Sequence, residues 1–193
     1  MRNHHGVKMS NVDNNVLINS FFVTNVDRKF THKGERMSLF ENFARITPFL
    51  WFNNNAEEAA DFYVSIFKNS HRHGEMRAAA DNPSTPAGAV ITVSFELDGQ
   101  QFTAMNGGPG HNFTDAISLV VRCESQEEID HYWSRLTEGG GSEVACGWLK
   151  DKFGLSWQIV PANIGELVNH PKAFQAMMQM KKLDIAALKR AAE

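Results

Sequence analysis

An internal repeat constrains the fold of this chain more than any other feature of its sequence. The segment ITPFLWFNNNAEEAADFY (residues 46–63) aligns with the segment ISLVVRCESQEEIDHYW (residues 117–133), which places Glu57 opposite Glu127. Self-similarity between two stretches of one chain is typical of tandem supersecondary units. The chain is therefore predicted to contain two modules of the same design.

Each half of the repeat is predicted to form a strand, a helix and three further strands. Helix starts are indicated by Asn55 with Glu58 and by Ser125 with Glu128, which have the spacing of a capping box. The segment AVITVSFELDG (residues 89–99) alternates apolar and polar residues, as a half-buried strand does. The predicted fold class is therefore α+β, with two tandem βαβββ modules.

The ends of the two halves also match. The segment DGQQFTAMN overlays FGLSWQIVP when Gly99 is aligned with Gly154, which predicts a hairpin turn at residues 151–154 followed by the last strand. Side chains alternate between the two faces of a strand, so Trp157 and Gln158 must face opposite ways. We predict that Trp157 packs in the core and that Gln158 faces away from it.

The N-terminal segment differs from the rest of the chain in composition. Residues 1–44 lack a helical or strand period and are predicted to be a disordered extension, in which His4 and His5 lack the further ligands of a metal site. Codons for the Lys-Gly-Glu-Arg that precedes Met37 can spell a ribosome-binding site, so we expect translation to start at Met37. The remaining chain is divided into a two-module domain at 45–161, with modules at 45–106 and 116–161, and a C-terminal helical segment at 162–193.

Composition excludes several classes of partner. The 193-residue chain is 42% hydrophobic with a formal net charge of −3, and its Lys and Arg residues are scattered, so no nucleic-acid footprint is expected. No apolar run approaches the roughly 20 residues that cross a bilayer, so no membrane association is expected. The two cysteines fit free thiols in a reducing compartment, and we predict a cytoplasmic protein.

Five segments together resemble one family. ITPFLWF, AEEAADFYVSIF, FELDGQQFTAMNGGP, CGWLKDKFGLSWQIVP and MKKLDIAALKRA are similar to the PhnB-like branch of the vicinal oxygen chelate superfamily, also called the 3-demethylubiquinone-9 3-methyltransferase-like domain. The superfamily includes glyoxalases, extradiol dioxygenases and bleomycin- or fosfomycin-resistance proteins. The resemblance runs from about Arg45 to the C-terminus. It implies that the two mixed sheets curl into a cup that holds a small molecule.

The same resemblance identifies where metal-using relatives place their ligands. Carried through the repeat, these four positions fall at Pro48, Thr103, Ser118 and Gln158. Proline has no side-chain ligand atom, and neutral hydroxyl and amide oxygens are weak donors for zinc, iron or manganese. We therefore expect no metal at this place and no cofactor.

A neutral polar set is expected to hold the ligand in place of a metal. Gln158 is predicted either to bind ligand beside Ser118 and Thr103 or to satisfy neighbouring backbone. The loop NGGPGHN (residues 106–112) connects the halves at the mouth of the cup. The predicted ligand-binding residues are Leu50, Phe52, Thr103, Met105, Asn106, His111, Ser118, Trp148 and Gln158.

Other reactive side chains are given structural roles. His71 and His73 alternate on a strand after the first helix and are interpreted as surface residues. Cys146 has no base near it in sequence and is interpreted as a small buried thiol. No strand is followed by a glycine-rich turn and a helix that could hold a nucleoside cofactor, so methyl transfer is not expected.

Three functions remain open at the level of sequence. The first is a small-molecule binder or metal-independent enzyme with an unknown small-molecule ligand. The second is a metal-dependent lyase, isomerase or dioxygenase with ligands at unexpected positions, and the third is a non-enzymatic interaction module that works through the C-terminal helices. Proteins that resemble this chain pair, and exposed sheet edges favour pairing, so a homodimer is expected.

Overall fold

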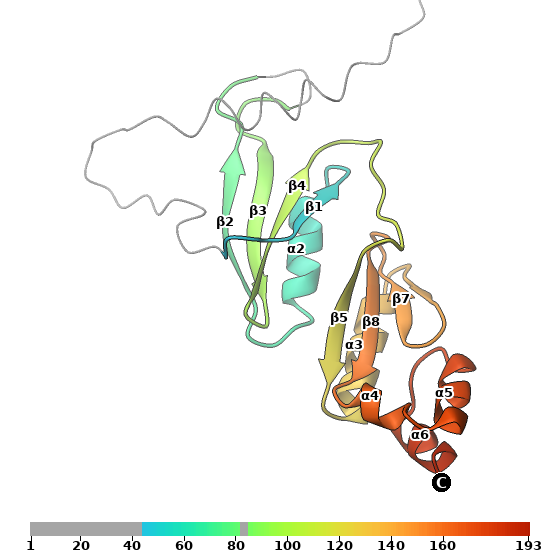
Figure 1. Cartoon of the computed structure of the whole chain (residues 1–193). Coiled ribbons are helices and arrows are strands. Elements are labelled where there is room, and N and C mark those ends of the chain that lie inside the picture. Colours follow the sequence, from blue (N-terminus) through green and yellow to red (C-terminus); the bar gives the residue numbers. More distant parts are fainter. Residues whose placement is uncertain (1–43, 82–84) are drawn as a thin grey trace, which may run out of the picture. The chain divides into compact units, whose positions relative to one another are not determined.

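The computed structural model of the chain describes residues 44–81 and 85–193 (Figure 1). The predicted extension at 1–44 and the predicted start at Met37 therefore lie outside the described residues, except for residue 44. The first module consists of β1 (Phe49–Phe52), α2 (Ala56–Val64), β2 (His71–Arg77), β3 (Val90–Leu97) and β4 (Gln100–Asn106). The second consists of β5 (Ser118–Cys123), α3 (Gln126–Thr137), β6 (Ser142–Glu143), β7 (Trp148–Lys150) and β8 (Ser156–Pro161).

Each module has its own four-stranded mixed sheet. The strand order is β1-β4-β3-β2 in the first sheet, sheet A, and β5-β8-β7-β6 in the second, sheet B. The first strand of each module pairs in parallel with the last strand, while the other pairs are antiparallel. The predicted α+β fold with two βαβββ modules is confirmed, and among the described residues the strands form two separate open sheets rather than one.

One helix packs on one face of each sheet. Helix α2 contacts β3 and β4, and helix α3 contacts β7 and β8. Alternation along the strands sends buried apolar side chains toward these helices. In the first module they are Leu50, Phe52, Val93, Phe95, Phe102 and Ala104. The face of each sheet that is turned away from its helix, here called the open face, is left for other contacts.

The starts of the two long helices are capped in different ways. Ser125 Oγ accepts a hydrogen bond from the amide of Glu128 at 3.3 Å, which confirms the predicted cap of α3. The predicted cap of α2 by Asn55 is wrong, because its side chain makes no such bond. Asn106, at the end of β4, accepts from the amide of Ala56 at 2.8 Å instead.

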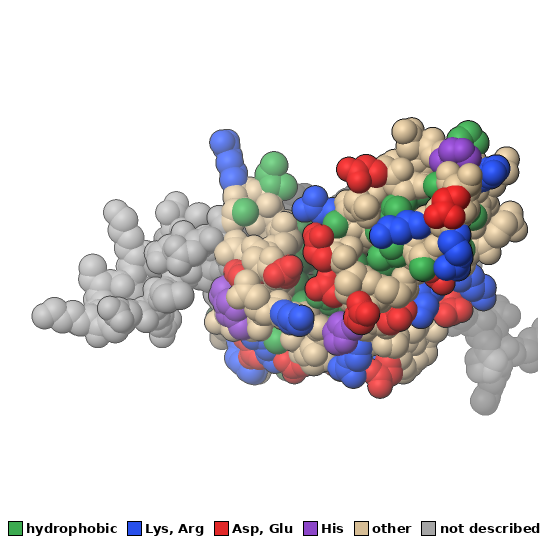
Figure 2. Space-filling view, turned by 90° about the horizontal axis from the view of Figure 1, so that it is seen from below, with side chains coloured by type: hydrophobic (Ala, Val, Ile, Leu, Met, Phe, Trp, Pro, Cys, Tyr) green, Lys and Arg blue, Asp and Glu red, His purple; other side chains and the backbone are tan. Residues whose placement is uncertain are grey.

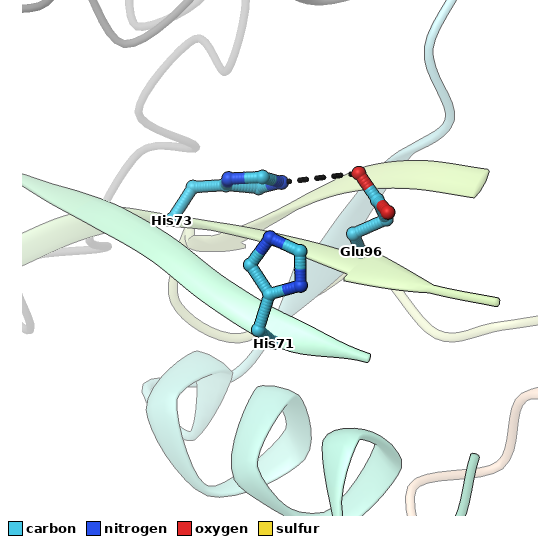
Figure 3. A group of neighbouring side chains, drawn as sticks. All are labelled: His71, His73 and Glu96. Carbon is cyan, nitrogen blue, oxygen red and sulfur yellow. Dashed lines mark ion pairs between the residues drawn. The ribbon is translucent and has the colours of Figure 1, made fainter. Parts of the chain in front are cut away.

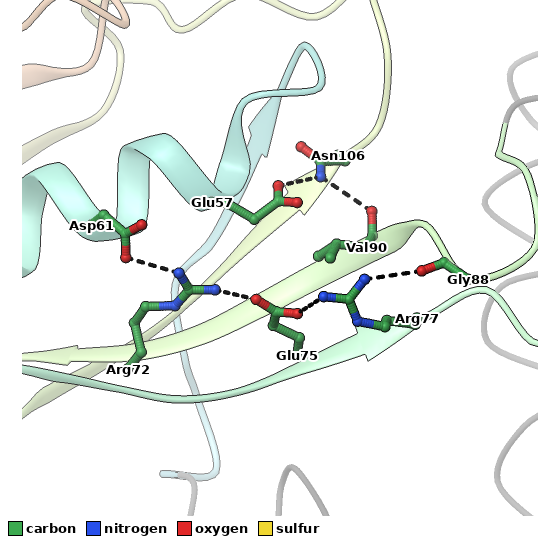
Figure 4. Close-up of polar contacts among 8 residues, drawn as sticks. All are labelled: Glu57, Asp61, Arg72, Glu75, Arg77, Gly88, Val90 and Asn106. Atoms are coloured by element: carbon green, nitrogen blue, oxygen red, sulfur yellow. Dashed lines mark hydrogen bonds and ion pairs between the residues drawn. The ribbon is translucent and has the colours of Figure 1, made fainter.

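Asn106 is also a donor to both neighbouring elements. Its Nδ2 donates to Glu57 at 2.6 Å and to the carbonyl of Val90 at 3.1 Å (Figure 4). Asparagine offers one acceptor and two donors, and all are used here. The side chain therefore connects the first turn of α2 to β3 and β4.

Asp151 is the most extensively hydrogen-bonded carboxylate in the core. Its Oδ2 accepts from the hydroxyl of Tyr63 and from Nε1 of Trp157, both at 2.8 Å. Its Oδ1 accepts from the amides of Phe153 at 2.9 Å and Leu155 at 3.1 Å. Burial raises the pKa of Asp151 above its usual value, and the four hydrogen bonds offset part of that effect. The predicted turn at residues 151–154 and the predicted core position of Trp157 are both confirmed.

The C-terminal segment is helical, as predicted, with α4 (Ile164–Leu167), α5 (Pro171–Met178) and α6 (Ile185–Ala191). Asp184 caps α6 by accepting from the amide of Ala187 at 2.8 Å. The segment is attached to the second module by backbone hydrogen bonds of 2.8 Å from Cys146 and Gly147 to the carbonyls of Met180 and Lys181. In the part of the chain that is described, no helix has the length and apolarity to cross a membrane.

Candidate functional site on the open sheet faces

The open face of sheet B carries a polar cluster. Strand register places Ser118 beside Ser156, and places Gln158 between Val120 and Trp148. Nε2 of Gln158 donates to Oγ of Ser118 at 2.8 Å. Within the described part of the chain, the other amide atom, Oε1, has no hydrogen-bond partner. Because Gln158 is half-buried, this acceptor is both fixed in place and open to a ligand.

A charged pair lies beside this amide. Lys150 pairs with Ser156 in the register, and its Nζ contacts the carboxylate of Asp115 at 2.9 Å. The hydroxyl of Ser156 donates to the same carboxylate oxygen at 2.9 Å. The hydrogen bond with Lys150, and then that with Ser156, lower the pKa of Asp115. The carboxylate therefore holds the ammonium group of Lys150 on the face that carries Gln158.

Lys150, Ser156 and Asp115 were not identified from the sequence. Strand alternation carried a usable signal for two of them, because Lys150 and Ser156 are an even number of residues from Trp148 and Gln158 respectively. Asp115 precedes β5 in a loop, and only the folded chain brings it to Lys150.

The open face of sheet A is partly covered by the loop between the modules. Trp51 donates from Nε1 to the carbonyl of Gly108 at 2.9 Å, and its ring centroid lies 4.5 Å from that of His111. A Cβ atom at Gly107 would lie 2.1 Å from the Trp51 ring, so only glycine allows this approach. Thr103 and Met105 lie on the same face through their pairing with Phe49 and Trp51.

The structure separates the predicted ligand-binding residues into groups. It brings together Ser118, Gln158 and Trp148 on sheet B, while Thr103 and Met105 lie on sheet A and His111 lies against Trp51. Leu50 and Phe52 face helix α2 with only 6% and 3% of their surface exposed. Their place in the ligand site stays a prediction, and the structure places both on the helix-covered face. The amide of Asn106 is similarly engaged in capping α2.

The side chains at the four positions that metal-using relatives employ are poor metal ligands. The backbone carbonyl of Pro48 accepts from the amide of Thr103 at 3.0 Å, and Thr103 is 1% exposed. Ser118 and Gln158 bond to each other. None of the four side chains is an imidazole, thiolate or carboxylate, the donors that zinc and iron prefer.

Charge is mixed on the surface that can be inspected in Figure 2. Acidic and basic side chains lie interspersed on this face, with exposed apolar side chains between them. Such mixing lacks the clustering of Lys and Arg that accompanies binding to a nucleic-acid backbone.

Comparison with known proteins identifies the family. Residues 44–160 match the sequence family described as 3-demethylubiquinone-9 3-methyltransferase. The chain belongs to this family. The predicted PhnB-like resemblance is thereby confirmed. No curated protein is significantly similar to the chain.

Solved structures similar to this 3-demethylubiquinone-9 3-methyltransferase family member include a putative 3-demethylubiquinone-9 3-methyltransferase, PhnB protein, from Bacillus cereus. It is 38% identical, with 61% of this chain and 99% of that chain covered and a TM-score of 0.54. Protein PA1353 from Pseudomonas aeruginosa is 19% identical over 61% of this chain and 98% of its own, with a TM-score of 0.50. The fosfomycin resistance protein FosX from Listeria monocytogenes is 14% identical over 64% and 93%, with a TM-score of 0.45.

Proposed function

We propose that the chain binds a small polar molecule on the open face of sheet B, as a sequestering binder or as an enzyme that uses no metal at the four customary positions. The observation that carries this proposal is the Gln158 amide, which is fixed by Ser118 through Nε2 and leaves Oε1 unpaired among the described residues. A half-buried acceptor of this kind recognises a donor group of a ligand.

The neighbours of Gln158 favour a ligand that also carries an anionic or carbonyl oxygen. Lys150 supplies an ammonium group, and Asp115 fixes its position. Trp148, which is half-buried and beside Gln158 in the register, supplies an apolar surface. A few polar groups beside an aromatic ring are the usual composition of a small-molecule site.

Methyl transfer, the activity in the family description, is not part of this proposal. A nucleoside cofactor is held by a glycine-rich turn between a strand and a helix. In this chain β1 is connected to α2 by Asn53, Asn54 and Asn55, and β5 is connected to α3 by Glu124 and Ser125. Neither connection contains a glycine that would let a phosphate approach the backbone.

Replacing Gln158 tests the site. A screen of metabolites by thermal shift identifies ligands first, and each is then titrated against the Gln158→Leu variant. Leucine keeps a similar volume but removes the donor and the acceptor, so affinity should fall by about 1–3 kcal/mol, roughly five- to more than a hundredfold. The matched control is Gln100→Leu, the same change at an exposed residue of sheet A, which should leave affinity unchanged.

Two outcomes would contradict the proposal. In the first, Gln158→Leu keeps full affinity for every ligand while its melting midpoint falls, which would make Gln158 a structural residue. In the second, Gln100→Leu weakens binding as much as Gln158→Leu, which would place the site elsewhere.

We also propose that the protein is a cytoplasmic homodimer. The strands β1 and β5 lie at sheet edges and expose apolar side chains, with 47% of Phe49 and 56% of Val120 accessible. Pairing with a second copy would cover such edges. Cys123 and Cys146 are free, which suits a reducing compartment. Light scattering that shows a monomer at micromolar concentration would contradict the dimer.

A further inference from the structure

Two histidines and a glutamate meet on the open face of sheet A. His71 is the register partner of Glu96 on the neighbouring strand β3, and His73 lies two residues further along β2. The register shifts between Arg72 and Gly74, so His73 is the extra residue of a β-bulge. Bulges re-aim side chains, and this one leaves both imidazoles on the side of the Glu96 carboxylate.

The intervening residue confirms that the two faces of β2 differ in chemistry. Arg72 points toward helix α2, where it pairs with Asp61 at 2.8 Å and with Glu75 (Figure 4). The cations on the helix side of β2 therefore have their own carboxylates. The two histidines on the other side share Glu96.

The three side chains have the geometry of a ligand set. One ligand atom from each lies within 4.8 Å of the other two. Nε2 of His73 is 3.4 Å from Oε2 of Glu96, and Figure 3 shows the three side chains directed toward one another. Ligand atoms about 2.1 Å from a tetrahedral ion are roughly 3.4 Å apart. The ring centroid of His71 lies 4.4 Å from that of His73, which brings both imidazoles to the same carboxylate.

We propose that His71, His73 and Glu96 bind a divalent transition metal ion, with zinc as the best fit. Imidazole nitrogen and carboxylate oxygen are preferred zinc ligands, and two histidines with one glutamate leave a coordination position open. Both histidines are exposed, so an ion can enter and the open position can accept water or an oxygen atom of a small molecule. The site lies on sheet A and is independent of the proposed ligand site on sheet B.

An ion pair between His73 and Glu96 does not account for the cluster on its own. Such a pair needs one imidazole, whereas here a second imidazole lies edge-on against the first. A single metal ion accounts for both rings, because each imidazole can bind it through one ring nitrogen.

Zinc binding by the full-length, untagged chain tests the proposal. All variants carry His4→Ala and His5→Ala, so that the N-terminal histidines do not contribute. With zinc as the only probe, equilibrium dialysis should show about one ion per chain, and His71→Ala or His73→Ala should weaken binding by more than the roughly 10–100-fold that loss of an outer-shell partner costs. His170→Ala, at an exposed histidine elsewhere, is the control and should bind zinc normally.

Glu96→Gln provides a variant that keeps the shape of the side chain. It should also weaken zinc binding, and the rise in melting midpoint that zinc causes in the parent chain should disappear. Circular dichroism confirms that each variant is folded.

Zinc binding of unchanged affinity in the His71→Ala/His73→Ala double variant would overturn the assignment, as would a parent chain that binds no zinc. Either result would leave the Gln158 test unaffected, because that test measures an organic ligand in the absence of added metal.

Discussion

The hairpin turn of the first module holds its aspartate in solvent, whereas the turn of the second module holds its aspartate in the core. Asp98 and Gly99 join β3 to β4 as two residues with positive φ angles of 46° and 85°, and Asp98 is exposed. Between β7 and β8 the connection is longer, and Asp151 turns inward to accept four hydrogen bonds. One of these donors, Tyr63, belongs to the first module.

The helix starts differ between the modules in the opposite sense. Helix α3 is capped by Ser125, three residues away, while α2 depends on Asn106 at the end of the module. The two modules therefore share their connectivity but not the partners of their polar groups. In the first module the turn aspartate is in solvent and the helix cap comes from a distant residue. In the second module the helix cap is local and the turn aspartate bonds to a distant residue.

The largest expected effect is the loss of stability when the turn aspartate of the second module is replaced. Asp151→Asn replaces one acceptor oxygen by an NH₂ donor, so two of the four donors lose their partner. The free energy of unfolding should fall by about 2–4 kcal/mol, because hydrogen bonds to a buried charged acceptor are among the strongest. Urea unfolding measures this loss, provided that the m value, the slope of the unfolding free energy against urea concentration, is the same for both chains.

The matched change in the first module is Asp98→Asn. Asparagine tolerates a positive φ angle, and the site is exposed, so the effect should stay within about 0.5 kcal/mol. Equal destabilisation by the two variants would show that the buried hydrogen bonds do not distinguish the turns.

An intermediate effect is expected at the two helix caps. Asn106→Ala removes three hydrogen bonds and should lower the free energy of unfolding by about 2 kcal/mol. Ser125→Ala removes one cap and should lower it by about 1 kcal/mol. Thermal and urea unfolding of both variants measure the difference, with Asn112→Ala, at an exposed loop residue, as the control. A larger loss for Ser125→Ala would reverse the comparison.

The smallest expected effect is a pH dependence that belongs to Asp151. Its raised pKa means that the folded state holds the proton more tightly than the unfolded chain, whose aspartate has a pKa of about 3.9. Stability from this group is therefore present below about pH 4 and is lost as the pH rises through the folded pKa. We expect the unfolding free energy of the parent chain minus that of Asp151→Asn to fall as the pH rises from about 4 through the folded pKa.

Subtracting the unfolding free energy of the variant from that of the parent chain removes the contributions of the other carboxylates, because their ionisation is common to both chains. A difference that rose with pH would mean that the hydrogen bonds from Tyr63 and Trp157 outweigh burial and lower the pKa of Asp151 instead.

Much of the fold was predictable because it depends on periodicity. The alternation around Phe95 and the repeat of Glu57 at Glu127 were sufficient for the βαβββ connectivity. The cap at Ser125 was predictable because its partner is three residues away. The cap of α2 was not, since Asn106 reaches it only through the sheet.

The candidate site on sheet B was predictable through the family resemblance and the repeat. Together they placed Gln158 beside Ser118, and that prediction agrees with their hydrogen bond. For Leu50 and Phe52 no face could be assigned from the sequence, because the apolar segment FLWF gives no polar residue to indicate which side is covered. The group of His71, His73 and Glu96 depends on the register between two strands, which no single segment encodes.

The dependence of α2 on Asn106 has a consequence for the order of events during synthesis. The cap lies 50 residues after the amide that it accepts, so at about 5–20 residues per second the first turn of α2 waits about 2.5–10 seconds for it. Helix α3 needs only three further residues before its own cap can form. Although the first module leaves the ribosome earlier, its helix start is completed only when its last strand has emerged.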